Sequence, residues 1–395
     1  MSNYVNWKKA FKQAAAVGLI LCLGLIILIG GFIVVNYDNL GRLVRVVYLV
    51  NSQHLEDPPL SKLVDGAIEG IVSSLDTYSS FQDAEENKAL LESLQGSLGG
   101  IGVYLSVADP QKLVIRSPIK GSPADRAGLE AGDIILKIDG IDVSTMTQQK
   151  AVSILRGEPG TKVTVGIYRP RTGKDFSVNL IREKISVPTV QVQALPGRED
   201  IALIDISNFS QNTGEELERE FSKMDWDSYK GFIIDLRYNC GGEVNASIKV
   251  ASLLVPQGDI VHVVDKKGRI ETKKSTAQYI NKPFVILINE YTASAAEIVS
   301  GAVKDYGSGD LVGVKTFGKG VVQTLFPLDN NTSVKLTTDK YLTPLKNDIH
   351  QKGIEPDVEV HLKEGEKPTI LPEDTNFDSQ LTKAIEVLTE KIKGR

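Results

Sequence analysis

The chain has 395 residues, of which 42% are hydrophobic and 24% are charged, a composition typical of folded globular proteins and not of disordered or disulfide-rich chains. Its formal net charge of -5 disfavours a nucleic acid as the main partner. At roughly 150 residues per domain, the length predicts two to three folding units. The two cysteines, Cys22 and Cys240, lie far apart in different segments, so no intrachain disulfide is expected.

An uncharged apolar segment covers residues 14–35. As a helix it would be about 33 Å long, enough to cross the hydrocarbon core of a bilayer, so we expect a single transmembrane anchor. A cleaved secretory signal is the alternative, but the segment is long for one and no A-x-A-like cleavage site follows it. Three lysines precede the segment, which favours a cytoplasmic N-terminus over residues 1–13. The predicted location is a bacterial cell membrane, with the rest of the chain on the extracytoplasmic side.

The next part, residues 36–95, is predicted to be mainly helical. Apolar residues recur at three- and four-residue steps from Leu60 to Leu75, the pattern of an amphipathic helix, and a second helical stretch covers residues 84–94. A cluster of glycines ends this stretch and predicts a domain boundary near residue 96. Its members are Gly96, Gly99, Gly100 and Gly102.

A glycine-rich turn lies near the start of the segment over residues 96–182. It exposes several backbone N–H groups in one direction, which can hold a carboxylate; the residues are Gly100, Ile101, Gly102 and Val103. Together with G-S-P-A-D-R-A-G-L and A-G-D-I-I-L-K-I-D-G further on, this turn resembles a bacterial PDZ domain, a partly open β-barrel with two helices. The resemblance implies that a peptide C-terminus binds there as an added strand, with its carboxylate at the turn and its side chain toward Leu155. A tight turn in a domain used only for contacts is the alternative.

Ser294 follows a short apolar run at residues 283–288 and precedes helically spaced apolar residues that end at Gly307. This pattern predicts a strand, a turn and a helix that begins directly after the serine. An isolated serine in such a position is usually a helix N-cap. It can also be a nucleophile, because free N–H groups and the positive end of the helix dipole would stabilise an oxyanion formed beside it.

A nucleophilic serine needs a base, and none of the four histidines lies in a setting typical of a catalytic triad. Lys319 lies between two glycines at the start of a predicted strand, and Gln323 follows four residues later, which places both side chains on the same face of that strand. Gln323 can therefore hold the amine in place. A lysine base requires a pKa lowered by about three units, roughly 4 kcal/mol, which burial can supply. An ordinary exposed strand lysine is the alternative.

Four further motifs accompany the PDZ-like segment. In chain order they are S-S-L-D-T-Y-S-S-F at residues 73–81, L-R-Y-N-C-G-G at 236–242, T-A-S-A-A-E at 292–297 and K-T-F-G-K-G-V-V-Q at 315–323. Together they resemble the C-terminal processing peptidases, or tail-specific proteases, of peptidase family S41. The resemblance implies an α/β fold, in which a ClpP/crotonase-like serine protease core over residues 183–364 is combined with an inserted PDZ domain. A helical tail over residues 365–395 would follow, either as a surface helix, which is the more common case, or as a homo-oligomer contact.

The same resemblance implies a role for each site residue. Ser294 would be the nucleophile, Lys319 the general base and Gln323 the residue that orients the lysine. The oxyanion hole would consist of the backbone N–H groups of Ala295 and Gly241. Cys240 stands where these proteases commonly carry Pro or Ser, and as a rival nucleophile it has no base supplied by the sequence.

These features predict a membrane-anchored serine endopeptidase that cuts near the C-terminus of extracytoplasmic proteins with unfolded or exposed tails. The PDZ domain would bind the tail, gate the site, or do both. No metal or other cofactor is expected, because the chain has no H-E-x-x-H, C-x-x-C or G-x-x-x-x-G-K-[ST] motif. Two alternatives stay open: a non-catalytic PDZ adaptor tethered to the membrane, and a signal peptidase-like Ser/Lys enzyme, which would leave the PDZ domain without a task.

Overall fold

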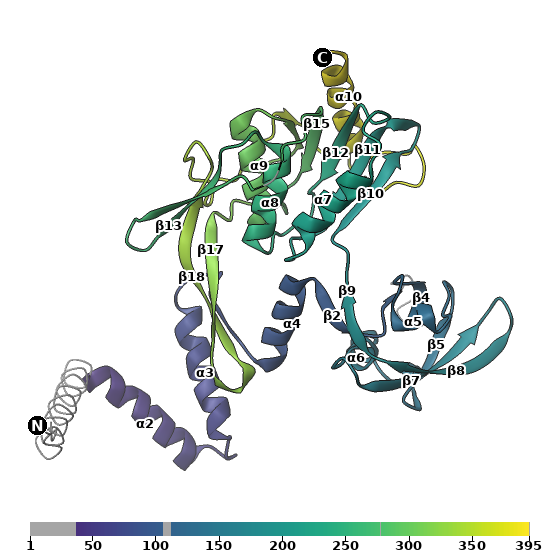
Figure 1. Ribbon diagram of the computed structural model, residues 1–395. Coiled ribbons are helices and arrows are strands. Elements are labelled where there is room, and N and C mark those ends of the chain that lie inside the picture. The colour runs from purple at the N-terminus through teal and green to yellow at the C-terminus, as the bar shows by residue number, and fades with distance from the viewer. Residues whose placement is uncertain (1–36, 106–111, 277, 395) are drawn as a thin grey trace, which may run out of the picture. The chain divides into compact units, whose positions relative to one another are not determined.

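The computed structural model describes residues 37–105, 112–276 and 278–394 (Figure 1). These residues form two compact units, one that ends at Leu75 and one that begins at Asp76. The first unit contains α2 (Tyr37–Gln53) and α3 (Leu60–Ser73). The predicted amphipathic helix corresponds to α3.

The predicted transmembrane helix, residues 14–35, lies outside the described residues. Within the described ranges, no helix is long and apolar enough to cross a membrane. The first of these helices, α2, has 17 residues, about 25 Å of helix against a hydrocarbon core of about 30 Å, and it carries Arg42 and Arg45. The predicted fold class is corrected accordingly: the described elements include no membrane-spanning helix.

A mostly parallel sheet forms the centre of the second unit (Figure 1). Its first strand is antiparallel to the second, and each later neighbour is parallel to the one before. Short apolar strands of this kind are typical of sheets buried on both faces. In sheet order the strands are β10 (Val190–Leu195), β11 (Arg198–Ile206), β12 (Gly231–Asp235), β15 (Phe284–Ile288), β16 (Asp310–Gly313) and β19 (Val358–Glu359).

Side chains alternate across each strand, so this sheet has apolar side chains on both faces. Helices cover both faces. In β15, Phe284, Ile286 and Ile288 pack in the hydrophobic cluster that includes α7, α8 and α9, whereas Val285 and Leu287 pack with α10. The apolar face of α10 is thus used within its own chain. The helices are α7 (Thr213–Lys223), α8 (Val244–Leu254), α9 (Ala295–Tyr306) and α10 (Ser379–Lys393).

A second, antiparallel sheet contacts α8 and α9 through β13. Its strand order is β1-β18-β13-β14, and β17 also pairs with β18. Asn87 joins the helix α4 to this sheet, because its Nδ2 donates to Asn331 O at 2.8 Å and its Oδ1 accepts from Ser333 Oγ at 2.8 Å. The elements are β1 (Ser80–Gln82), α4 (Ala84–Gln95), β13 (Asp259–Asp265), β14 (Ile270–Lys274), β17 (Val321–Pro327), the 3₁₀ turn η2 (Asp329–Asn331) and β18 (Ser333–Leu342).

The PDZ-like segment has its own hydrophobic core, which includes Ile115, Ile135, Ile138 and Val165. Its strand order is β3-β4-β5-β7-β8, with β6 paired to β5, and the chain enters and leaves it through the antiparallel pair β2 and β9. Two α-helices complete it. The elements are β2 (Ser97–Gly100), β3 (Val103–Leu105), β4 (Leu113–Pro118), α5 (Pro123–Arg126), β5 (Ile134–Ile138), β6 (Ile141–Asp142), η1 (Val143–Thr145), α6 (Gln148–Leu155), β7 (Lys162–Arg169), β8 (Lys174–Ile181) and β9 (Glu183–Ser186).

The loop after β12 and the loop after β15 lie side by side at the carboxyl edge of the central sheet, because these two strands are parallel neighbours. Buried Asn289 joins the loops: its Oδ1 accepts from the N–H groups of Tyr238 at 3.0 Å and Tyr291 at 3.1 Å. Ala293 N–H also donates to Asn239 O at 3.0 Å. The L-R-Y-N-C-G-G and T-A-S-A-A-E motifs are thereby held together.

Candidate active site

Ser294 lies between β15 and the first residue of α9. Its backbone angles, φ 56° and ψ -117°, lie in a region that non-glycine residues rarely adopt and that costs about 1–3 kcal/mol unless the surroundings hold it. Ser294 and Glu297 form a capping box at the start of α9, so the serine is also the N-cap of this helix. In the described part of the chain the N–H of Ala295 has no acceptor. Capping accounts neither for the strained backbone of Ser294 nor for this N–H, which is left for a substrate.

A buried glutamate fixes the two segments that carry the predicted dyad. Glu297 Oε2 accepts from the N–H groups of Ser294 at 2.9 Å and Lys319 at 2.8 Å. Its Oε1 accepts from Gly318 N at 2.7 Å and Thr316 Oγ1 at 2.6 Å. Burial raises the pKa of this carboxyl group, and the four hydrogen bonds oppose that rise. One side chain thus joins the first turn of α9 to the segment that leads into β17.

Lys319 is half-buried and lies two residues before β17. Burial lowers the pKa of its ammonium group, the positive charge of Lys335 lowers it further, and Cys240 and Glu297 act in the opposite direction. Its Nζ lies 5.2 Å from the ring centroid of Tyr78 and, as far as the structure describes the chain, makes no ion pair or hydrogen bond. The pKa of Lys319 is therefore shifted in the direction that a general base requires.

Gln323 lies in β17 opposite Thr337. A register shift between Val322 and Gln323 interrupts the regular alternation on which the same-face prediction depends, yet Lys319 and Gln323 line the same cavity. Among the residues that the structure describes, the buried Gln323 Nε2 has no hydrogen-bond partner. A buried amide without a partner is costly. Gln323 Nε2 is thus free to donate to a substrate oxygen, whereas the predicted orientation of the Lys319 amine would use the amide oxygen as acceptor.

Gly241 lies directly beside Ser294. Its φ is +97°, and a Cβ at this position would lie 2.8 Å from Ser294 Cβ and 2.9 Å from Ala295 N, so only glycine fits without displacement. The N–H of Gly241 donates to Asn239 Oδ1 at 2.9 Å. Of the two predicted oxyanion donors, Ala295 N–H is therefore open, whereas Gly241 N–H is engaged within its own turn. The two donors are neighbours, and their joint role stays a prediction.

These residues surround one cavity of about 360 Å³, which Ser294, Lys319, Gln323 and Gly241 all line. Lys335 also lines it and, within the described ranges, has no ion pair. The same ranges contain no group of side chains that could hold a metal ion. Part of the wall is apolar and suits an uncharged peptide side chain; it includes Leu90, Leu94, Val244, Ile298, Val322 and Leu325.

The five predicted PDZ residues also come together around one groove. This groove has a volume of about 330 Å³ and a mainly apolar lining, to which Gly100, Ile101, Gly102, Val103 and Leu155 all contribute. The N–H groups of Ile101 and Gly102 have no acceptor among the described residues. The groove therefore combines open donors for a carboxylate with an apolar surface for a side chain.

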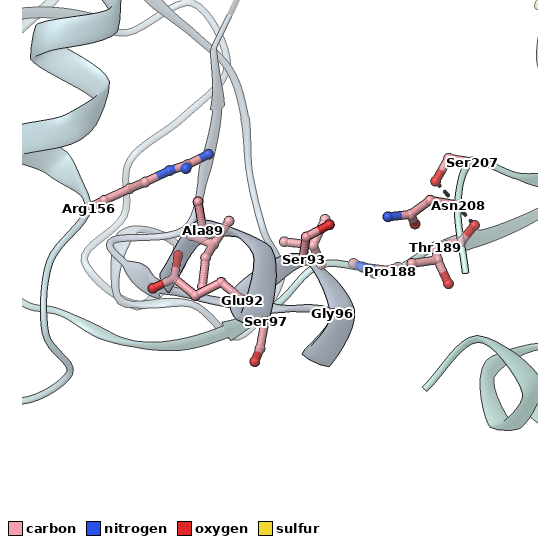
Figure 2. Close-up of a pocket in the computed structure, with 12 residues that line it drawn as sticks. Ala89, Glu92, Ser93, Gly96, Ser97, Arg156, Pro188, Thr189, Ser207 and Asn208 are labelled. Atoms are coloured by element: carbon pink, nitrogen blue, oxygen red, sulfur yellow. Dashed lines mark hydrogen bonds between the residues drawn. The ribbon is translucent and has the colours of Figure 1, made fainter. Parts of the chain in front are cut away.

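A separate cavity of about 390 Å³ lies beside α4 (Figure 2). Figure 2 shows residues of α4 and of the turn that follows it, together with a second group that includes Thr189 and Ser207, whose N–H donates to Thr189 O at 3.0 Å. The lining contains serines but neither a lysine nor a histidine. It therefore offers no serine with a lysine or histidine base, and none of the predicted site residues contributes to it.

The sequence reasoning missed three residues of this site. Glu297 stands three positions after Ser294, and this S-x-x-E spacing is a known helix-start pattern that could have revealed it. Tyr78 belongs to a quoted motif, but nothing local places its ring at Lys319. Tyr341 lies in β18, and its hydroxyl reaches both Ser294 O and Lys319 O at 2.9 Å. Only the long-range pairing of β17 with β18 brings this tyrosine to the site.

Comparisons with known proteins identify the family and the PDZ domain. Residues 200–360 match peptidase family S41, and residues 114–169 match the PDZ domain. The carboxy-terminal processing protease CtpA of Bacillus subtilis is 37% identical over 333 residues, which cover 84% of this chain and 71% of that protein. The carboxy-terminal-processing protease of Bartonella bacilliformis is 35% identical over 333 residues, or 82% of this chain and 76% of that protein. The crystal structure of a Bacteroides fragilis protein described as an S41 protease shares the fold, with a TM-score of 0.52 at 18% sequence identity. The match covers 86% of this chain and 93% of that one.

The fold and the site thus define a serine-type peptidase that carries a PDZ domain. The chain belongs to peptidase family S41, and over most of its length it is similar to carboxy-terminal processing proteases. The resemblance stated from the motifs is confirmed. The non-catalytic adaptor is disfavoured by the same finding.

Proposed function

We propose that this peptidase cleaves protein substrates near their C-terminus, with Ser294 as nucleophile and Lys319 as general base. The observation that carries the proposal is the shared cavity. It is lined by a serine whose neighbouring N–H has no acceptor in the described part of the chain and by a lysine whose pKa is lowered by burial. Only a neutral amine can take the proton of a serine hydroxyl. The kind of substrate is taken from the names of the two bacterial relatives.

In the first step, Ser294 Oγ attacks the carbonyl carbon of the scissile peptide bond while Lys319 Nζ takes the hydroxyl proton. The negative charge that forms on the carbonyl oxygen is stabilised by the N–H of Ala295. Gly241 can add a second donor if its N–H exchanges Asn239 Oδ1 for the substrate oxygen. Lys319 then returns the proton to the leaving amine, the C–N bond breaks, and an ester on Ser294 remains.

In the second step, neutral Lys319 takes a proton from water, and the oxygen of that water attacks the ester carbon. The C–O bond to Ser294 breaks, its oxygen recovers the proton, and the shortened substrate leaves with a new carboxylate. Both steps need Lys319 Nζ within hydrogen-bond reach of Ser294 Oγ, roughly 2.6–3.2 Å. Gln323 would hold the amine there by accepting one of its N–H groups through Oε1.

The PDZ groove would bind the substrate tail. A terminal carboxylate fits the open N–H groups of Ile101 and Gly102, and an apolar side chain fits the surface that includes Leu155. Binding of the tail would select substrates, gate the catalytic cavity, or do both. The location of the catalytic part on the extracytoplasmic side stays a prediction.

The proposal is tested with a folded protein that carries a disordered apolar tail, followed by intact-mass measurement. We expect the wild type to shorten this protein at its C-terminus and Ser294→Ala and Lys319→Ala to leave it intact. Ser300→Ala is the matched control, because Ser300 lies on the same helix and only donates to Ala296 O at 2.9 Å. A Ser294→Ala variant that still removes the tail would contradict the assignment of the nucleophile. Addition of a free tail peptide separates the two roles of the PDZ domain: faster cleavage of an unrelated substrate supports gating.

A further inference from the structure

The hydroxyl of Tyr341 lies between the backbones of the two dyad residues. It donates to Ser294 O at 2.9 Å and to Lys319 O at 2.9 Å, so its single hydrogen is shared between two carbonyl oxygens. The backbone N–H of Tyr341 donates to Gly320 O at 3.0 Å. Tyr341 is 2% exposed and borders the catalytic cavity. One residue of β18 thus contacts both segments of the site.

Tyr341 complements Glu297. The carboxylate of Glu297 accepts the N–H groups of Ser294 and Lys319, whereas the hydroxyl of Tyr341 donates to the carbonyl groups of the same two residues. Burial raises the pKa of Tyr341 well above its usual range, so this hydroxyl keeps its proton and stays a donor. The two backbones are therefore joined by one acceptor and one donor.

The two carbonyl groups depend on Tyr341 to different degrees. Ser294 O also accepts from Glu297 N at 2.8 Å and from Ile298 N at 3.1 Å, so the first turn of α9 helps to hold it. Lys319 O has no other donor among the residues described. Loss of the hydroxyl would therefore free mainly the Lys319–Gly320 peptide, and with it the point from which the lysine side chain extends.

We infer that Tyr341 is a positioning residue of the dyad: its hydroxyl fixes the backbone of Lys319 against that of Ser294 so that the amine can reach the serine oxygen. This inference rests on the proposed function. It concerns the chemical step, because Tyr341 acts on the nucleophile and its base and not on the PDZ groove. A displacement of about 1 Å of a catalytic group can slow a reaction about 100-fold.

The test compares Tyr341→Phe with the wild type in two assays. The first is the rate at which a serine-directed β-lactone acylates the enzyme by ring opening, normalised to the number of sites that finally react, so that unfolded molecules do not count. The second separates kcat from KM on a tailed peptide substrate. We expect acylation and kcat to fall about 10- to 100-fold, with KM within about twofold of the wild type.

Tyr306→Phe is the matched control. Tyr306 ends α9, and its hydroxyl also donates to a backbone carbonyl, Asp259 O at 3.1 Å, but it lies at the opposite end of the helix from Ser294. We expect this variant to acylate like the wild type even if it is less stable. Tyr341→Phe with a wild-type acylation rate per reactive site, or a loss confined to KM, would overturn the inference. A wild type that does not react with the probe, or a Ser294→Ala variant that reacts equally well, would instead contradict the proposed function.

Discussion

A Cβ at Gly241 is the smallest change that should disturb the nucleophile without replacing a reactive side chain. In Gly241→Ala the new atom would lie 2.7 Å from Ala293 O, 2.8 Å from Ser294 Cβ and 2.9 Å from Ala295 N. Restoring ordinary contact requires a displacement of about 0.6 Å, and two of the three neighbours are backbone atoms that cannot rotate away. The clash therefore falls on the serine and on the helical N–H beside it.

The expected loss in the free energy of unfolding of Gly241→Ala is the sum of two contributions. Forcing extra volume into a packed site costs about 1–3 kcal/mol, and an alanine in the left-handed region costs about 1–2 kcal/mol. We expect the free energy of unfolding to fall by the sum of these. Because a displacement of about 1 Å can cost about 100-fold in rate, we expect acylation by the β-lactone to fall at least about 10-fold per reactive site.

Gly307→Ala separates the two costs. Gly307 ends the same helix with a φ of +59°, and no atom lies within 4 Å of the position that a Cβ would occupy there. This variant should therefore lose stability through backbone strain alone and acylate at the wild-type rate. The reasoning is refuted if Gly241→Ala acylates as fast as Gly307→Ala, because the clash with Ser294 would then have no effect on the nucleophile.

Three further variants test charges in and near the site. Lys335→Met should raise the pKa of Lys319, because a like charge that disfavours the ammonium form is lost; the acid limb of the pH–rate profile should move to higher pH. Glu297→Gln cannot accept all four hydrogen bonds and should lower the free energy of unfolding by about 2–4 kcal/mol, measured with urea, and should slow acylation. Asp378→Ala leaves buried Arg237 without one of its two carboxylates, at 2.9 Å, and should cost about 3–5 kcal/mol in the same assay.

Each of these variants has a matched control. Lys335→Arg keeps the charge and should keep the pH profile, so an equal shift in both variants would contradict a charge effect. Glu216→Gln also changes a buried glutamate, one that accepts from Thr189 N at 2.7 Å; it should lose stability but acylate normally. Asp310→Ala removes a half-exposed partner of Lys391 at 2.6 Å and should cost about 0–1 kcal/mol. An Asp378→Ala variant no less stable than Asp310→Ala would refute the buried-charge explanation.

The lowered pKa of Lys319 also affects stability, with a definite sign. Between the folded and the unfolded pKa, the unfolded chain binds the proton more often than the folded protein does, so the free energy of unfolding rises as the pH rises through that interval. Below the folded pKa the lysine is charged in both states, and the cost of burying that charge is fully present. Lys319→Met should remove this part of the pH dependence.

Local patterns were sufficient for the residues whose place is set by their own segment. The apolar run before Ser294 and the helical spacing after it predict the strand, the turn and the helix that the structure contains. The glycine turn at Gly100 and the short helix that ends at Leu155 likewise form one groove. In these cases the chemistry depends on neighbours in the sequence, which periodicity and turn residues can indicate.

Contacts between segments that are distant in the sequence could not be predicted from these local patterns. The site uses Tyr341 because β18 pairs with β17, and no spacing near either strand indicates which partner it has. The same-face prediction for Lys319 and Gln323 assumed a regular strand, whereas a register shift lies between them. Gly241 N–H was predicted as a free donor, but a side chain two residues away, Asn239, accepts it. Each difference arises from contacts that only the folded chain creates.

The site fixes the backbones of its two reactive residues and leaves the side chain of the proposed base free. Ser294 and Lys319 are held through buried hydrogen bonds to Glu297 and Tyr341, whereas, in the part of the chain that is described, the lysine amine and Gln323 Nε2 have no hydrogen-bond partner. Moving the backbone would break buried hydrogen bonds at about 1–3 kcal/mol each, but rotating a free side chain breaks none. Rotation of the Lys319 and Gln323 side chains is therefore the change that this site allows at the lowest cost.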